Sequence, residues 1–184
     1  IEAKDRHTRG HCNRMRSICV ELGRLSGLTP DELEVLEYAS LLHDLGKIGV
    51  NEAILNKEGP LTAEECARIK EHAEIGEKIL LGIPMMEFVA TIIGSHHENF
   101  DGSGYPRRKK GSDIPLEARI IAVADIYDAM RSDRPYRKGL PIEVILNEMR
   151  RVSGTQLDPA LVDLFIENAV CEHEEETEAL VARL

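Results

Sequence analysis

The chain has 184 residues, of which 42% are hydrophobic, 4% are aromatic and none is tryptophan. This length is typical of one domain with a sizeable core, and a core made of aliphatic side chains favours packed helices over a β-sandwich. The formal charge of −10 argues against a domain that binds nucleic-acid polymers, because such domains need a net basic face. An anionic substrate must therefore be attracted by a local group of positive charges or by metal ions.

The rest of the composition indicates a cytoplasmic protein. The four cysteines show no CxxC spacing, which is typical of reduced, mostly structural thiols. No apolar run approaches the roughly 20 residues needed to span a bilayer, and no signal peptide is recognisable. We expect residues 1–184 to form a single domain with an acidic tail at 171–184. A regulatory sensory or receiver domain N-terminal to Ile1 and a homodimer are left open.

The first two expected helices each carry histidines. Apolar residues recur every three or four positions over about 4–25, and His7 and His11 are four apart, so both imidazoles share one side. A second helix starts at the capping sequence 29–32 and ends at His43–Asp44. A buried carboxylate there needs a cation or several hydrogen bonds to stay ionised. The alternative is an aspartate that caps the next turn beside an exposed histidine.

Two helices in the middle of the chain carry three more histidines. One is expected over 62–81, where Gly76 lies one turn after His72 and permits the close approach of another helix or of a ligand. The next covers about 84–97 and ends in the adjacent pair His96–His97. A lone histidine on an apolar helix face is more often a core residue than a ligand, so the spacing alone leaves their roles open.

The segments between these helices are expected to be loops. Residues 48–61 form one, and the sequence HHENFDGSGYP at 96–106 closes with a glycine turn before Tyr105. The basic run 107–110 that follows is typical of a solvated loop.

A buried helix with a positively charged end follows. The helix that starts near Ile114 is almost wholly apolar up to Asp125, and Asp128 lies on the same face. A carboxylate at the end of such a helix must be paired or bound to a metal. Arg134 and Arg137 belong to a basic group just beyond it. This group contrasts with the acidic whole and suits phosphate oxygens, because the planar arginine fork matches them.

The final two helices, which start near Pro141 and Asp158–Pro159, carry stripes that indicate packing only. No internal repeat, low-complexity linker or strand-period segment is recognisable. The expected architecture is all-α, with about seven helices.

Several histidines and aspartates end these helices or lie on their apolar faces. They are His11, His43, Asp44, His72, His96, His97 and Asp125. The set exceeds the ligands of one closed tetrahedral site and suits two metals that share a bridging carboxylate. Such ligands without thiolate favour Fe, Mn, Co, Ni or Zn and do not choose among them. Two metals can activate a bridging water for an in-line displacement at phosphorus, which indicates a dinuclear metal phosphohydrolase.

Four segments also carry a family resemblance. They are HDLGK at 43–47, the LTAEE turn that leads to His72, HHENFDGSGYP at 96–106, and ARIIAVADIYDAM with RPYR within 118–137. From about Asp5 to Phe165 the chain resembles the HD-GYP domain, a branch of the HD superfamily of metal-dependent phosphohydrolases. The resemblance implies a compact helical bundle that hydrolyses the bacterial second messenger cyclic di-GMP to linear pGpG, to GMP, or to both.

The resemblance also implies roles for individual residues. It assigns the seven candidates above as ligands of two metals, iron or manganese, with Asp44 bridging and Lys47 near the metal-bound water and the scissile phosphate. Arg134 and Arg137 bind substrate phosphate in this scheme, and Tyr105 contacts the substrate or shapes its pocket. The outer-shell candidates are Asp5, His7 and Asp128.

Two departures and two rival interpretations accompany this assignment. Some family members hold a third metal with a glutamate four residues before the first ligand histidine; this chain has His7 there, so two metals are expected. Ala73 replaces a frequent proline after the third ligand histidine.

One rival interpretation is hydrolysis of another nucleotide, such as pGpG or a different cyclic dinucleotide. The other is a non-catalytic sensor that binds a ligand or a partner, such as a diguanylate cyclase domain, through the GYP loop.

Overall fold

The computed structural model describes residues 11–132 and 138–168. Within these two ranges the regular structure is helical, and the one strand-like feature is an isolated bridge between Ser153 and Leu157. The all-α class predicted from the sequence is confirmed.

The α-helices range from the four residues of α3 to the 16 residues of α7. In chain order they are α1 (His11–Leu25), α2 (Pro30–Leu42), α3 (Glu52–Leu55), α4 (Ala63–Lys70), α5 (His72–Leu81), α6 (Glu87–Ile93), α7 (Leu116–Arg131) and α8 (Ile142–Val152), followed by helical residues 159–168. Two 3-10 helices, η1 (Leu45–Gly49) and η2 (Gly111–Asp113), lie between them.

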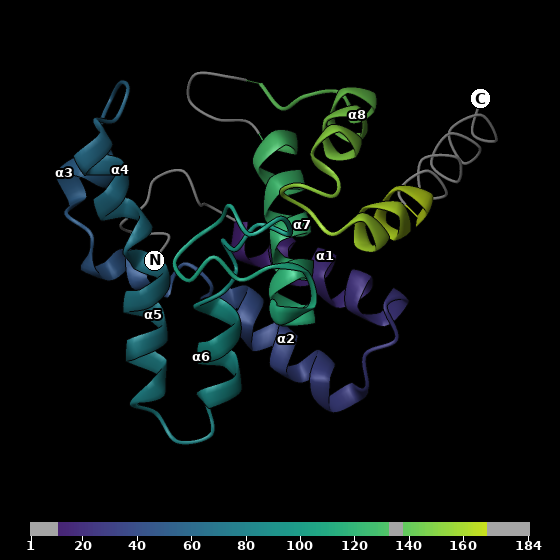
Figure 1. Ribbon diagram of the computed structural model, residues 1–184, viewed down its shortest axis with the longest axis horizontal. Helices are drawn as coiled ribbons and strands as arrows, with labels where there is room; N and C mark the ends of the chain where they lie inside the picture. Colours follow the sequence, from purple (N-terminus) through teal and green to yellow (C-terminus); the bar gives the residue numbers. More distant parts are fainter. Residues whose placement is uncertain (1–10, 133–137, 169–184) are drawn as a thin grey trace.

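The helices pack around α7 at the centre of the bundle. Figure 1 shows α1 crossing beside α7, with α2 below it and α8 at the other end. The antiparallel pair α5 and α6 forms one side, where α6 contacts α2 and α5 contacts η1. The long segment between α6 and α7 passes through the middle of the view. This arrangement brings the ends of α2 and α6, the start of α5 and the first described residues of α1 together.

The core is aliphatic, as the composition predicts. Met15, Leu36, Ile93 and Ile121 are fully buried and come from four different helices. Burial of each such side chain stabilises the fold by about 1.5–3 kcal/mol. No helix among the described residues combines the length and apolar character that crossing a membrane requires.

Three expected helix boundaries were wrong. The helix expected over 62–81 is divided into α4 and α5, and the one expected over 84–97 covers only Glu87–Ile93. The loop expected at 48–61 contains the short helix α3. The division falls at Glu71, which keeps helical backbone angles, and the ring Nδ1–H of the next residue, His72, donates to the Ile69 carbonyl.

Gly46 allows η1 to lie directly against the start of α5. A Cβ atom at this position would lie 1.8 Å from the carbonyl oxygen of His72 and 2.5 Å from the amide nitrogen of Gly76. Gly76 is close-packed from the other side, since a Cβ there would lie 3.1 Å from the amide nitrogen of Gly46. The sequence expectation that Gly76 permits close approach is confirmed. The element that approaches is η1, which carries Lys47.

We expect Gly46→Ala to destabilise the protein by at least about 2 kcal/mol, because the methyl group meets backbone atoms that cannot rotate away. Chemical denaturation followed by circular dichroism measures this change. Gly82→Ala is the matched control: a Cβ at Gly82 meets only the Ile79 carbonyl oxygen, at 3.4 Å. Equal stability of the two variants would contradict the close contact between η1 and α5.

Candidate metal centre

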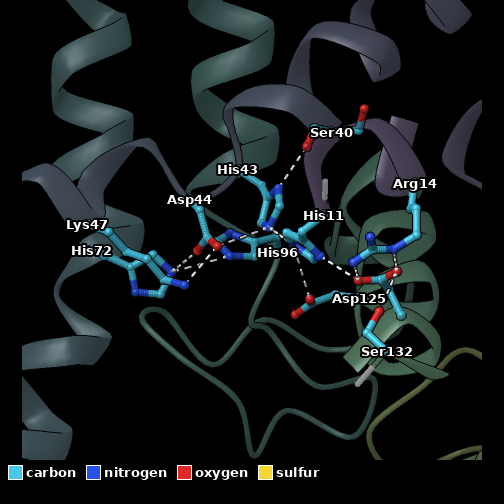
Figure 2. A network of polar contacts seen from close by, with 11 residues as sticks. His11, Arg14, Ser40, His43, Asp44, Lys47, His72, His96, Asp125 and Ser132 are labelled. Atoms are coloured by element: carbon cyan, nitrogen blue, oxygen red, sulfur yellow. Dashed lines mark hydrogen bonds and ion pairs between the residues drawn. The ribbon is translucent and has the colours of Figure 1, made fainter. Parts of the chain in front are cut away.

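The seven candidate ligands converge in one buried region of the bundle. One group comprises His72, His96 and His97, and a second comprises His11, His43 and Asp125; within each group the ligand atoms lie within 4.8 Å of one another. Figure 2 shows side chains from several helices meeting here, namely those of His11, His43, Asp44, His72, His96 and Asp125. The chain therefore brings together residues that are far apart in sequence.

Helix ends place most of these side chains. His72 is the first residue of α5, the pair His43–Asp44 directly follows α2, and His96–His97 follows the last turn of α6. His11 lies in α1, at the beginning of its described part. Asp125 is different, because it lies within α7. Side chains at helix ends can face a common centre, whereas neighbours inside a helix spread over its surface.

Asp44 lies between the two groups. Its Oδ2 is 3.4 Å from His43 Nε2, and its Oδ1 is 3.6 Å from His72 Nε2. The Lys47 ammonium lies 2.8 Å from Oδ2. The two carboxylate oxygens thus face different groups, which is the arrangement that a bridging ligand requires.

Backbone carbonyls fix the orientation of three imidazoles. The Nδ1 atoms of His43, His72 and His96 lie 2.7, 2.6 and 2.5 Å from the carbonyl oxygens of the residues three positions earlier. Because a carbonyl oxygen only accepts, each Nδ1 carries a proton and donates. In the neutral form, Nε2 of each ring then presents a lone pair to the centre. Metal-binding histidines are commonly held in this way.

The contact between His72 and His96 indicates a cation. Their Nε2 atoms are 3.4 Å apart, and both are acceptors once Nδ1 holds the proton. Two lone pairs that face each other in a buried site repel, and a positive ion between them removes the repulsion. The donor set of this group therefore fits a metal ion.

Protonation at this group is disfavoured. Burial lowers the pKa of His72, and burial together with neighbouring imidazoles lowers the pKa of His96 well below its usual range. The same causes lower the pKa of His97 to about 3. All three rings are neutral near pH 7, and neutral imidazole is the form that binds metals.

In the second group, protonation of a histidine is favoured. Burial opposes the charged form of His43, but the adjacent Asp44 carboxylate outweighs it and raises the pKa of His43 to about 9. Burial also opposes ionisation of Asp44, yet His43, Lys47 and His72 hold the pKa of its carboxyl well below the usual value. A proton on His43 and a metal ion satisfy the same carboxylates, so a metal bound here takes the place of that proton.

Asp128 lies behind His11, at the position of an outer-shell residue. This buried carboxylate accepts from His11 Nδ1 at 2.7 Å, from Arg14 Nε at 2.5 Å and Nη2 at 3.1 Å, and from Ser132 Oγ at 3.3 Å. The bond to His11 directs the Nε2 atom of that ring toward Asp125, 3.8 Å away. Sequence reasoning missed Arg14, although its place three residues after His11 was a signal.

The loop that contains the motif HHENFDGSGYP at 96–106, here the GYP loop, is held by a carboxylate that sequence reasoning also missed. Glu98 is 3% exposed, and its two oxygens accept the backbone N–H groups of Arg107 and Lys109 at 2.7 and 3.0 Å. A Cβ at Gly104 would lie 2.1 Å from the amide nitrogen of Asn99, so only glycine fits there. The loop folds back on itself and carries Tyr105 to the site.

Tyr105 stacks against a candidate ligand. Its ring lies 4.8 Å from that of His97, centroid to centroid, at an interplanar angle of 27°. Burial raises the pKa of the Tyr105 hydroxyl, so the side chain is neutral. Tyr105 also lines the cavity described below, in agreement with the expectation that it shapes the pocket.

The solvated loop expected at 107–110 is exposed at Arg107, Arg108 and Lys110, whereas Lys109 is half-buried. The loop also makes contacts that the sequence did not predict. The Arg107 guanidinium pairs with Glu77 of α5, and Lys109 Nζ donates to Ser95 Oγ at 3.3 Å. The first and third residues of the run therefore anchor the GYP loop to the α5–α6 pair.

A cavity of about 330 Å³ opens onto the two groups. Its walls include the candidate ligands His11, Asp44, His72, His97 and Asp125, the cations Arg14 and Lys47, and Tyr105, Asp128 and Ser132. The predicted residues Asp5, His7, Arg134 and Arg137 and the tail 171–184 lie outside the described residues.

Fold and site together define a helical metal-centre protein with histidine and carboxylate ligands. A family model described as HD domain matches residues 1–161. The chain belongs to the HD domain family, as its HDLGK motif predicts.

Named relatives and solved structures agree with this family. The chain is 39% identical to the 3'3'-cGAMP-specific phosphodiesterase 2 of Vibrio cholerae, over 91% of this chain and 33% of that protein. It is 38% identical to a cyclic di-GMP phosphodiesterase of Thermotoga maritima, over 90% and 45%. A solved cyclic GMP-AMP phosphodiesterase of V. cholerae shares the fold with a TM-score of 0.68 at 24% identity, over 91% of this chain and 46% of that one. The chain thus spans less than half the length of these proteins.

We expect Glu98→Gln to loosen the GYP loop. The amide –NH2 of glutamine would face one of the two backbone N–H donors, at a cost of about 1–3 kcal/mol. Hydrogen exchange of residues 98–110 measures this directly. The matched control is Glu58→Gln, at an exposed turn position. Unchanged protection in Glu98→Gln would show that the carboxylate does not hold the loop.

Metal content tests the bridging position of Asp44. We expect Asp44→Ala to lose nearly all bound metal, because it removes a ligand from both groups, whereas His72→Ala should lose about one equivalent. Elemental analysis of proteins purified without oxygen measures the loss, with Asp163→Ala, an exposed site, as control. Equal metal loss in Asp44→Ala and His72→Ala would contradict a bridge.

Proposed function

We propose that this domain is a metal-dependent phosphodiesterase that hydrolyses cyclic di-GMP to pGpG, to GMP, or to both. The observation that supports this most strongly is the position of Asp44 between two histidine groups, beside Lys47 and open to a cavity. A pure binding module does not need seven converging ligands of this kind.

The cyclic dinucleotide class is supported by the relatives. Proteins of Thermotoga maritima and Xanthomonas campestris, each 38% identical, are named cyclic di-GMP phosphodiesterases. Two relatives from Vibrio cholerae, each 39% identical, are named 3'3'-cGAMP-specific phosphodiesterases. These names make 3'3'-cGAMP the second candidate substrate. Both molecules contain two phosphodiester bonds in one ring, so the same site chemistry serves either.

The residues have distinct tasks in the proposed reaction. His72, His96 and His97 would hold one divalent metal, and His11, His43 and Asp125 the other, with Asp44 shared. When bound, two such ions polarise the phosphodiester and lower the pKa of the attacking water. Lys47, held 2.8 Å from Asp44 at the cavity wall, would compensate the negative charge that develops on the phosphate oxygens. We propose iron or manganese as the ions.

The charge of the cavity makes substrate binding depend on metal. Three carboxylates, Asp44, Asp125 and Asp128, line it against two cations, Arg14 and Lys47. His43, whose pKa is raised to about 9, adds one positive charge in the absence of metal, so the metal-free site has no excess of positive charge to attract a dianion such as a cyclic dinucleotide. Two divalent cations would give the site that excess. Metal removal should therefore abolish both binding and hydrolysis.

Other features of the proposal come from the sequence. Arg134 and Arg137 are proposed to bind substrate phosphate, with Asp5 and His7 close to the metals. We place the domain in the cytoplasm, where reduced thiols persist. Regulation by a domain N-terminal to this chain and a homodimer are further expectations.

The decisive experiment is product analysis with defined metals. Protein stripped of metal and reconstituted with Mn²⁺ or Fe²⁺ under reducing conditions should hydrolyse cyclic di-GMP, and chelation should remove this activity. Chromatography of the products distinguishes pGpG from GMP, and parallel reactions with 3'3'-cGAMP rank the two substrates. Binding of cyclic di-GMP by metal-loaded protein without any hydrolysis would favour the sensor interpretation instead.

A further inference from the structure

Arg14 is a cation of the cavity wall that lies apart from Lys47. It lies in α1, three residues after His11, and lines the same cavity as the candidate ligands. Its side chain is 45% exposed, so it faces solvent as well as protein. In Figure 2, Arg14 and Lys47 lie at opposite ends of the polar network, with His43 and His11 between them.

The guanidinium of Arg14 is held in a fixed orientation. Its Nε and Nη2 atoms donate to the two oxygens of Asp128, which is itself buried at 3% exposure. A bidentate pair of this kind fixes the plane of the group and reduces the conformational entropy that a later contact would cost.

The position of Arg14 suits a second anionic group on the substrate. A cyclic dinucleotide has two phosphodiesters on opposite sides of its ring. One phosphate would react beside Asp44 and Lys47, between the two ligand groups. The second phosphate would then lie in another part of the same cavity, and Arg14 and Ser132 line its wall on the side of the polar network away from Lys47 in Figure 2.

We propose that Arg14 binds the phosphodiester that is not being cleaved and so selects for cyclic dinucleotides over substrates with a single phosphate. This inference rests on the proposed phosphodiesterase function. Asp128 acts as the support that presents the guanidinium to the substrate. Arg14 is therefore a specificity-determining residue of the site, in addition to its contact with the carboxylate behind His11.

A purely supporting role for Arg14 makes a different prediction. If Arg14 only holds Asp128, and through it His11, its loss should disturb the metal group of His11, His43 and Asp125. Every substrate would then suffer alike, and metal content would fall. If Arg14 instead contacts the substrate, its loss should weaken the reaction of one class of substrate and leave the metal content unchanged.

The test compares two substrates and two variants. Arg14→Gln and the control Arg16→Gln, an exposed residue of the same helix paired with Glu37, are reconstituted with Mn²⁺ and assayed on cyclic di-GMP and on bis(p-nitrophenyl) phosphate, which has one phosphate. We expect Arg14→Gln to raise the KM for cyclic di-GMP on the order of tenfold or more. The loss in kcat/KM should exceed the loss on bis(p-nitrophenyl) phosphate by a similar factor, at unchanged metal content.

Three results would overturn the proposal. They are an equal loss on both substrates, a fall in metal content that accounts for the loss, and an effect of Arg16→Gln as large as that of Arg14→Gln.

Equilibrium binding of cyclic di-GMP distinguishes failure of the Arg14 contact from failure of the proposed phosphodiesterase function. If wild-type protein binds but does not hydrolyse the ligand, the enzyme proposal fails, and a weaker Kd in Arg14→Gln still supports the contact. If wild-type protein does neither, both proposals fail.

Discussion

The hydrogen bonds from imidazole Nδ1 atoms to backbone carbonyls organise this molecule. His43, His72 and His96 each donate to the carbonyl three residues earlier, at the end of α2, before α5 and at the end of α6. Each bond fixes the plane of its ring and directs Nε2 to the centre. Ligand geometry therefore depends on chain geometry, and a shift in any of these helix ends would move a ligand.

The carboxylates depend on this arrangement of rings. Asp44 is 6% exposed, and its charge is tolerated because His43, His72 and Lys47 surround it. Such a cluster contributes little to the free energy of folding, because the desolvation of each charge must be offset by its partners. Gly46 contributes by letting η1 lie against α5, which keeps Lys47 near Asp44. The buried polar cluster is therefore best explained by a bound cation and not by stability.

Sequence reasoning predicted the parts that follow from periodicity and from the cost of buried charge. The all-α class, the central apolar helix α7 and the convergence of His11, His43 and Asp125 were accessible in this way. The division between α4 and α5 was not, because Glu71 between them keeps helical backbone angles and no helix-breaking residue marks the position. Glu98 was missed because its backbone partners lie 9 and 11 residues further along the chain. A charged residue inside a loop motif gives no sign of burial until the loop is folded.

The cavity wall beyond the metal ligands can explain how one metal centre serves a restricted set of substrates. Chemistry at the metals is indifferent to what lies beyond the scissile bond, so discrimination must come from contacts farther away. Arg14 is suited to this task because Asp128 fixes its plane while nearly half of its side-chain surface stays exposed. Contacts to phosphate do not distinguish guanine from adenine bases. Selection between cyclic di-GMP and 3'3'-cGAMP must therefore arise from residues that face the bases, whereas Arg14 and Lys47 would recognise the ring of two phosphates that both molecules share.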